Sequence, residues 1–283
     1  MTATRTSRAA RRPPRPGAPA ARSAVFRRAA LGAAGLAVLF GVAQFAVWLG
    51  GANRLTFPLP STVLGGVASL ARTSAFWSSF GGTITAWAEA MAITIVIGVP
   101  AGLLLGSFPA AQAAVTPVIE FLRPVPSVVL VPAILLIVQD PMRTQVVAIV
   151  FAAIWPVLIN TIYGVRNVDP VAVATLRSFG FGPLSVAGRV ALPSAAPFVA
   201  TGIRIAASVA FVVAVAVELV STGVTGLGSY ATVTESGTTD LTPLLALAVW
   251  SGIFGLVING VFAAADRRAF RWHHALIAQG KGQ

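Results

Sequence analysis

The sequence predicts an all-α polytopic membrane protein with about six transmembrane helices. Of its 283 residues, 56% are hydrophobic and only 10% are charged, so a soluble domain of this length would lack polar surface. Several long uncharged intervals each supply the ~20 apolar residues needed to cross a bilayer. These intervals are 29–53, 90–119, 144–165 and 241–265, with shorter apolar stretches at 124–139 and around 198–220. The sequence lacks the short alternating segments that are typical of a membrane barrel.

The predicted spans follow a basic N-terminal tail. Residues 1–28 are rich in Pro, Arg and Ala, and we expect them to be disordered. The apolar run after them exceeds the ~7–15 residues of a signal-peptide core, so we interpret it as a retained first span. The predicted spans are 29–50, 84–107, 113–138, 145–165, 196–220 and 241–265, with a C-terminal tail at 266–283.

Two parts of this pattern are irregular. The outer segment 51–83 contains Ser61 as a candidate helix cap, and either a short interfacial helix or a plain connecting loop fits it. The third span contains Pro124, Pro126 and Pro132, which we expect to kink it. Because its uncharged core is short, this span is expected to begin upstream, with Glu120 and Arg123 paired near the cytoplasmic interface.

The basic residues predict the orientation of the chain in the membrane. Eight arginines precede residue 29, and seventeen of the twenty Lys and Arg residues fall in segments on the same side as the N-terminus. By the positive-inside rule, both termini are expected in the cytoplasm. The same distribution accounts for the net charge of +12 without nucleic acid as a partner.

The residue inventory excludes most catalytic and metal chemistry. There are no cysteines, the two histidines are adjacent in the C-terminal tail, and Lys281 is the only lysine, so a P-loop is absent. "GVTGLG" at 223–228 lacks the spacing of a nucleotide-binding loop and is interpreted as turns. We therefore expect neither an enzyme nor a cofactor site in this chain.

The stretch from Ala174 to Phe198 is basic and rich in turn residues although it separates two apolar spans. Asp169 and Pro170 predict a helix start, and Gly180 predicts its end in a left-handed conformation. A second short helix is expected at about 183–191, ended by Pro193. The apolar side chains of this stretch favour either docking of another protein or packing of the two short helices on their own bundle. Both interpretations remain open.

Several motifs then resemble a known family. "G180-x9-V190-x-L192-P193" is similar to the EAA loop of permease subunits in binding-protein-dependent ABC importers. "GVPAGLLLGS" at 98–107, "PVIEFLRPVPSVVLVPAILL" at 117–136, "LPSAAPFVATGIRIA" at 192–206 and "GLG" at 226–228 are similar to the nitrate, taurine and aliphatic sulfonate branch. The resemblance covers roughly residues 55–265. The chain departs from the family at Ala174–Arg177, where a glutamate usually begins the loop, and at 138–140, where glycines are frequent.

The resemblance implies a type I ABC importer permease fold with a cytoplasmic coupling helix in the loop 166–195. It implies that two ABC ATPase subunits bind ATP and Mg, and that an extracytoplasmic binding protein delivers a small anionic solute through the inner membrane of a bacterium. We expect a second copy of this chain to complete the pathway as a homodimer within membrane lipid. The residues implied to contact the ATPase are Leu176, Arg177, Phe179, Gly180, Leu184, Val190, Leu192 and Pro193.

Two acidic residues within the spans need an explanation, because charges at membrane depth are unfavourable. Glu218 is either a contact of the outer gate or a residue that reaches water at the interface. Glu89 is interpreted as lying near the interface. The alternative function, an ion-coupled secondary transporter, would need a buried ion site and paired interrupted helices, and the sequence provides neither.

Overall fold

The computed structural model describes residues 18–49, 58–235 and 240–269, and within these ranges the chain is helical, without a strand. The chain divides at Ser61 into two compact units. The first unit contains α1 (Ala18–Leu49), an apolar helix long enough to cross a membrane. Because α1 begins at Ala18, the predicted boundary of the disordered tail at residue 28 is corrected, and residues 1–17 lie outside the described part.

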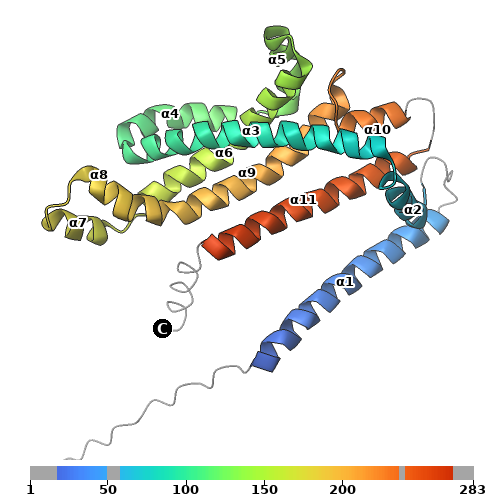
Figure 1. Cartoon of the computed structure of the whole chain (residues 1–283), viewed down its shortest axis with the longest axis horizontal. Coiled ribbons are helices and arrows are strands. Elements are labelled where there is room, and N and C mark those ends of the chain that lie inside the picture. The colour runs from blue at the N-terminus through green and yellow to red at the C-terminus, as the bar shows by residue number, and fades with distance from the viewer. Residues whose placement is uncertain (1–17, 50–57, 236–239, 270–283) are drawn as a thin grey trace, which may run out of the picture. The chain divides into compact units, whose positions relative to one another are not determined.

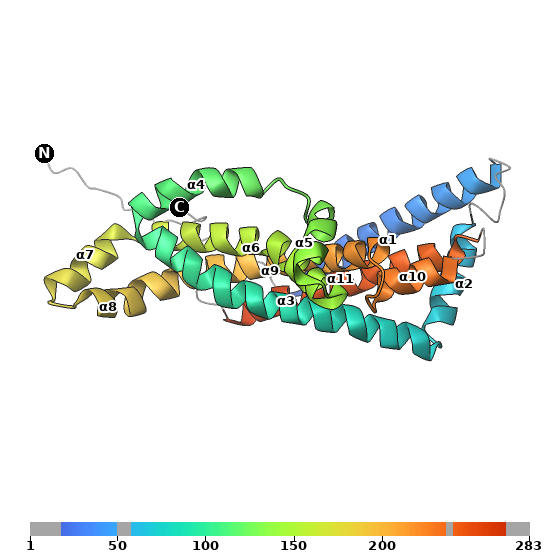
Figure 2. The same ribbon diagram turned by 90° about the horizontal axis from the view of Figure 1, so that it is seen from above.

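The second unit is a helical bundle built around α6. Its long helices α3, α6 and α9 run side by side, with α11 next to α9 and α4 next to α3 (Figures 1 and 2). The elements are α2 (Pro60–Leu70), α3 (Ser74–Ser107), α4 (Pro109–Leu122), the 3-10 turn η1 (Ser127–Leu130), α5 (Val131–Val138), α6 (Pro141–Arg166), α7 (Pro170–Ser178), α8 (Pro183–Val186), the π-helical turn η2 (Ala187–Ala191), α9 (Leu192–Val220), α10 (Leu227–Glu235) and α11 (Thr242–Ala269).

The prediction of about six spans is confirmed. Five helical segments are long and apolar enough to cross a membrane, and a sixth arises if α4 and α5 are counted as one bent span. The end of the bundle that carries the α3–α4 connection, α7 and α8 is called the loop end here, and the end that carries α10 is called the far end (Figure 2). The short helix α2 corresponds to the helix predicted in the outer segment, although it begins at Pro60, one residue before the predicted cap.

The third span is broken rather than kinked. The axis turns by 85° between α4 and the segment that contains α5. Pro124 and Pro126 lie in this break, where they supply no backbone N–H and disfavour helical conformation in the residues before them. The predicted pair of Glu120 with Arg123 is not formed, since the ion pair found among the described residues joins Arg143 to Asp140.

Small residues allow the central helices to approach closely. Gly98, Gly102 and Gly106 repeat at every fourth position of α3 and face α6. A Cβ atom at Gly102 would lie 2.5 Å from the Cβ atom of Thr161, so a larger residue would separate the two helices. Buried alanines of α3, α6 and α9 fill the rest of this core. The bundle is therefore held by close backbone packing, as is typical of helices in membranes.

Candidate functional sites

The loop-end helix α7 forms as the sequence predicts. The Asp169 carboxylate accepts a hydrogen bond from the backbone N–H of Val171 at 2.8 Å, which satisfies a free donor of the first turn. Gly180 ends the helix with a φ of +82°. The N–H groups of Gly180 and Phe181 donate to the carbonyls of Arg177 and Leu176, at 3.0 and 3.2 Å. Both ends of α7 are thus capped, and its last turn has the hydrogen bonds of a Schellman motif.

The prediction that Pro193 ends a second short helix is wrong. α8 continues through the π-helical turn η2 into α9, so Pro193 lies inside one continuous helical segment. A wider turn directly before the proline accommodates its missing N–H, which would break an ordinary α-helical ladder. Around this turn Leu192, which the resemblance implies to be an ATPase contact, is 52% exposed, whereas Val186 is buried.

The residues predicted to contact the ATPase lie mainly on an open surface. Phe179 is 76% exposed, Arg177 and Pro193 are exposed, and Leu176 and Val190 are half-buried. No residue of α7 is buried, so this helix is not laid against its own bundle. The backbone of Leu184 lies in α8, and its side chain falls outside the described part of the chain.

A cation–aromatic contact orders the connection between α7 and α8. The guanidinium carbon of Arg189 lies 4.6 Å from the ring centre of Phe181. Such contacts are favourable at this distance. Arg189 thereby joins the π-helical turn to the residue that follows Gly180, which stiffens the loop-end segment, defined here as residues 169–191.

Glu218 lies at a junction of four helices near the far end of the bundle. Its carboxylate accepts hydrogen bonds from the Thr83 hydroxyl at 3.0 Å, the Gln145 amide at 2.8 Å and the Gly228 backbone N–H at 2.9 Å. The Thr83 oxygen in turn accepts from the N–H of Leu227 at 2.9 Å. The junction therefore links α3, α6, α9 and α10 through one side chain.

The two glycines of "GLG" are needed for this junction. A Cβ atom at Gly226 would overlap the Glu218 carboxylate, and one at Gly228 would lie 2.5 Å from the carbonyl oxygen of Val215. This segment is therefore more than the set of turns predicted from the sequence, because it brings α10 into contact with a buried carboxylate. The sequence analysis missed Thr83, Gln145 and the glycine contacts. Their signal was a pair of polar residues in apolar spans and a Gly-x-Gly near Glu218.

The burial of Glu218 bears on the interpretation that this side chain reaches water at the interface. The side chain has 0% exposed surface, so it does not reach water at an interface. A carboxylate that accepts hydrogen bonds from three donors stabilises the junction of the helices.

Two other charged residues lie within long helices. Glu89 is exposed in the middle of the 34-residue helix α3, because α3 begins at Ser74, well before the predicted span at 84–107. Its place near an interface stays a prediction. Arg204 is also within a long helix, where its Nε donates to the Asn259 side-chain oxygen of α11 at 2.7 Å. Within the described ranges, no group of three or more His, Cys, Asp or Glu residues could hold a metal ion.

Comparisons with known proteins agree with this architecture. The family described as binding-protein-dependent transport system inner membrane component matches residues 95–271. The taurine transport system permease protein TauC of Escherichia coli is 29% identical over 253 residues, which cover 87% of this chain and 91% of TauC. The bicarbonate transport system permease protein CmpB of Synechocystis is 28% identical over 155 residues, and this match spans 55% of each chain.

Solved structures show the same fold. An amino acid ABC transporter with histidines gives a TM-score of 0.58 at 20% identity, covering 71% of this chain and 97% of the other. The MetNI methionine ABC transporter gives a TM-score of 0.54 at 18% identity, covering 75% and 98%.

The bundle, with five or six helices that are long and apolar enough to cross a membrane, has the fold of ABC transporter permeases. The chain belongs to the family of binding-protein-dependent transport system inner membrane components, and it is a permease subunit of an ABC importer in the nitrate and taurine branch.

Proposed function

We propose that this chain is the membrane subunit through which ATP hydrolysis in a separate subunit drives the import of a small anionic solute. The solute is of the sulfonate, taurine, nitrate or bicarbonate type and is delivered by an extracytoplasmic binding protein. The names of the relatives support this range, because they include taurine and bicarbonate systems.

The observation that carries the proposal is the loop-end segment. α7 is capped at both ends, none of its residues is buried, and the large apolar side chain of Phe179 is 76% exposed. Exposed apolar groups rimmed by arginines are typical of a surface that another protein covers. A short, stiff helix transmits a rigid-body movement of its partner to the bundle without absorbing it by bending.

The partners follow from this role. We infer that one ABC ATPase subunit, which binds ATP and Mg, seats on the loop-end segment of each permease copy. The loop end and both termini then face the cytoplasm, as the distribution of basic residues favours. A second copy of this chain, related by two-fold symmetry, completes the pathway.

Affinity purification from a mild detergent tests the proposal. A tagged full-length chain should retain an ATPase with it, and mass measurement of the intact complex should find two copies of this chain beside two ATPase subunits. The purified complex should hydrolyse ATP faster when the loaded binding protein is added. A chain that purifies without any ATPase would contradict the proposed function.

A further inference from the structure

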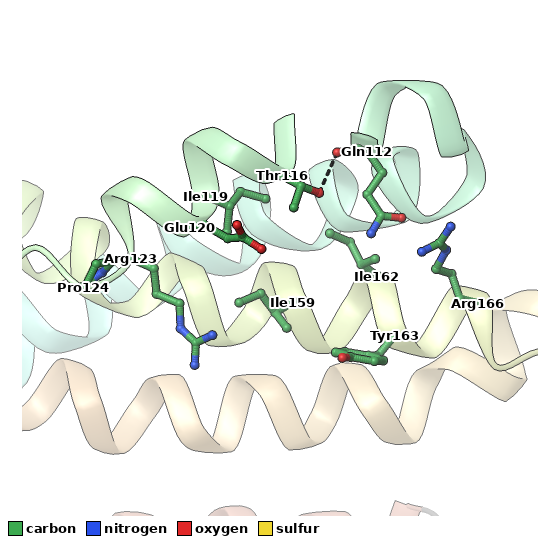
Figure 3. A pocket seen from close by; sticks show the side chains of 10 residues that line it. All are labelled: Gln112, Thr116, Ile119, Glu120, Arg123, Pro124, Ile159, Ile162, Tyr163 and Arg166. Atoms are coloured by element: carbon green, nitrogen blue, oxygen red, sulfur yellow. Dashed lines mark hydrogen bonds between the residues drawn. The ribbon is translucent and has the colours of Figure 1, made fainter. Parts of the chain in front are cut away.

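A cavity between α4 and α6 carries charges that have no role in the fold described so far. Its volume is about 580 Å³. This value lies in the range of ~300–1,000 Å³ that is usual for small-molecule sites. Figure 3 shows its lining, to which α4 and the residues directly after it contribute Gln112, Thr116, Glu120 and Arg123, while α6 contributes Tyr163 and Arg166.

The two arginines stand at opposite ends of this cavity. Arg166, the last residue of α6, lies at the loop end beside Gln112, whereas Arg123 lies beside Ile159 (Figure 3). From Ile159 to Arg166 the helix rises roughly 10 Å, at about 1.5 Å per residue. Arg123 is therefore about two helical turns away from the end of α6 along the helix axis, and both arginines are exposed.

These charged groups are unpaired in the part of the chain that the structure describes. Neither guanidinium forms a hydrogen bond or an ion pair there, and the Gln112 side-chain oxygen is buried without a partner. Two positive charges face the single negative charge of Glu120, which leaves the cavity net positive. Charged side chains at membrane depth face a water-filled cavity in preference to lipid. The space is thus a wet, positively charged cavity.

We propose that this cavity is a binding site for a small oxyanion on the transport pathway. The proposal rests on the proposed import function, because it assigns to this cavity the solute that the importer carries. The planar guanidinium groups match the oxygen atoms of a sulfonate, nitrate or carbonate group through paired N–H donors. The apolar side chains of Ile119 and Ile162 line the same space beside these polar groups.

The headgroup phosphate of an anionic lipid has the same chemistry as such a solute. The experiment must therefore separate a dissolved anion from a lipid. The chain has no cysteine, so Thr116→Cys places a single reactive thiol in the cavity. The full complex with its ATPase is studied in nanodiscs of phosphatidylcholine, which carries no net charge.

The first measurement is the rate at which the thiol of Thr116→Cys reacts with an anionic and with a cationic methanethiosulfonate reagent. Each rate is divided by the rate at which the same reagent reacts with a small free thiol. The net positive charge of the cavity should favour the anionic reagent roughly tenfold or more. Arg123→Gln should remove most of this preference, and Arg123→Lys, which keeps the charge, should retain it. Arg72→Gln is the matched control, because Arg72 is exposed in the α2–α3 connection and should leave the preference unchanged. Equal normalised rates for the two reagents would overturn the proposal.

The second measurement is protection against a neutral thiol reagent. Taurine, nitrate or bicarbonate at millimolar concentration should slow the reaction several-fold, and this effect should disappear in Arg123→Gln. If none of the three protects, or if only nanodiscs containing phosphatidylglycerol do, the solute site is disproved. Labelling needs no transport, so a complex that shows protection but no ATP-driven uptake would contradict the proposed function and leave the anion site standing.

Discussion

Among single residues, Glu218 is a buried acidic side chain that joins several helices. Its carboxylate is fully buried and accepts from Thr83, Gln145 and Gly228. Its position before a Gly-x-Gly could be read from the sequence, which marked it as a candidate. Its partners could not be predicted, because they come from α3, α6 and α10 and meet only in the packed bundle.

Replacing this carboxylate should loosen the junction. Glu218→Leu removes the acceptor of all three donors, and the backbone N–H of Gly228 is fixed and cannot turn to another partner. The loss should be about 1–3 kcal/mol in the free energy of unfolding. The thermal midpoint of the purified complex is the measurement, and it should fall clearly.

Two threonines of α3 provide a matched control. Thr83→Val removes both the donor to Glu218 and the acceptor for Leu227, so the midpoint should fall as well. Thr85→Val should change little, because the Thr85 hydroxyl is exposed and bonds only to carbonyls of its own helix. Equal effects of the two valine variants would argue against a special role for the junction.

The prediction of helical elements succeeded where local chemistry determines them. Asp169 and Gly180 cap α7 as expected, because capping depends on neighbouring residues alone. Pro193 did not end a helix, because a π-helical turn accommodates it, and no local signal marks such a turn. The prolines of the third span predicted a kink, whereas the 85° bend depends on how α4 and α5 pack on other helices.

The left-handed residue at the end of α7 leads to a test of coupling. Gly180 has a φ of +82°, a conformation that costs a residue with a Cβ atom roughly 1–2 kcal/mol and a β-branched residue more. Gly180→Val should therefore unwind the cap of α7 and reduce ATP hydrolysis stimulated by the binding protein, while the chain still inserts, because the spans are untouched.

The neighbouring glycine is the control for this change. A Cβ atom at Gly182 would meet no atom within 4 Å, and its φ is not positive. Gly182→Val should keep near-normal stimulation of ATP hydrolysis. Full activity in Gly180→Val would show that the conformation of this loop does not matter for coupling.

For the whole molecule, composition and charge spacing were sufficient to predict the class of fold, because the length of uncharged stretches is fixed by the thickness of the bilayer. Composition and charge spacing were not sufficient to predict where along a helix each charged residue lies, because the predicted starts of helices were wrong. Glu89, for example, is exposed at the middle of α3, which begins ten residues before the predicted span.

The central claim is that the loop-end segment is the seat of the ATPase. Because the chain has no native cysteine, Phe179→Cys supplies a single attachment point for a photoactivated cross-linker in the purified complex. Val233→Cys is the matched control, since Phe179 is 76% and Val233 74% exposed, and Val233 lies on α10 at the far end of the bundle (Figure 2). We predict a cross-linked product of this chain with the ATPase from position 179 and none from position 233. An ATPase that co-purifies but is captured from position 233, and not from 179, would contradict the account.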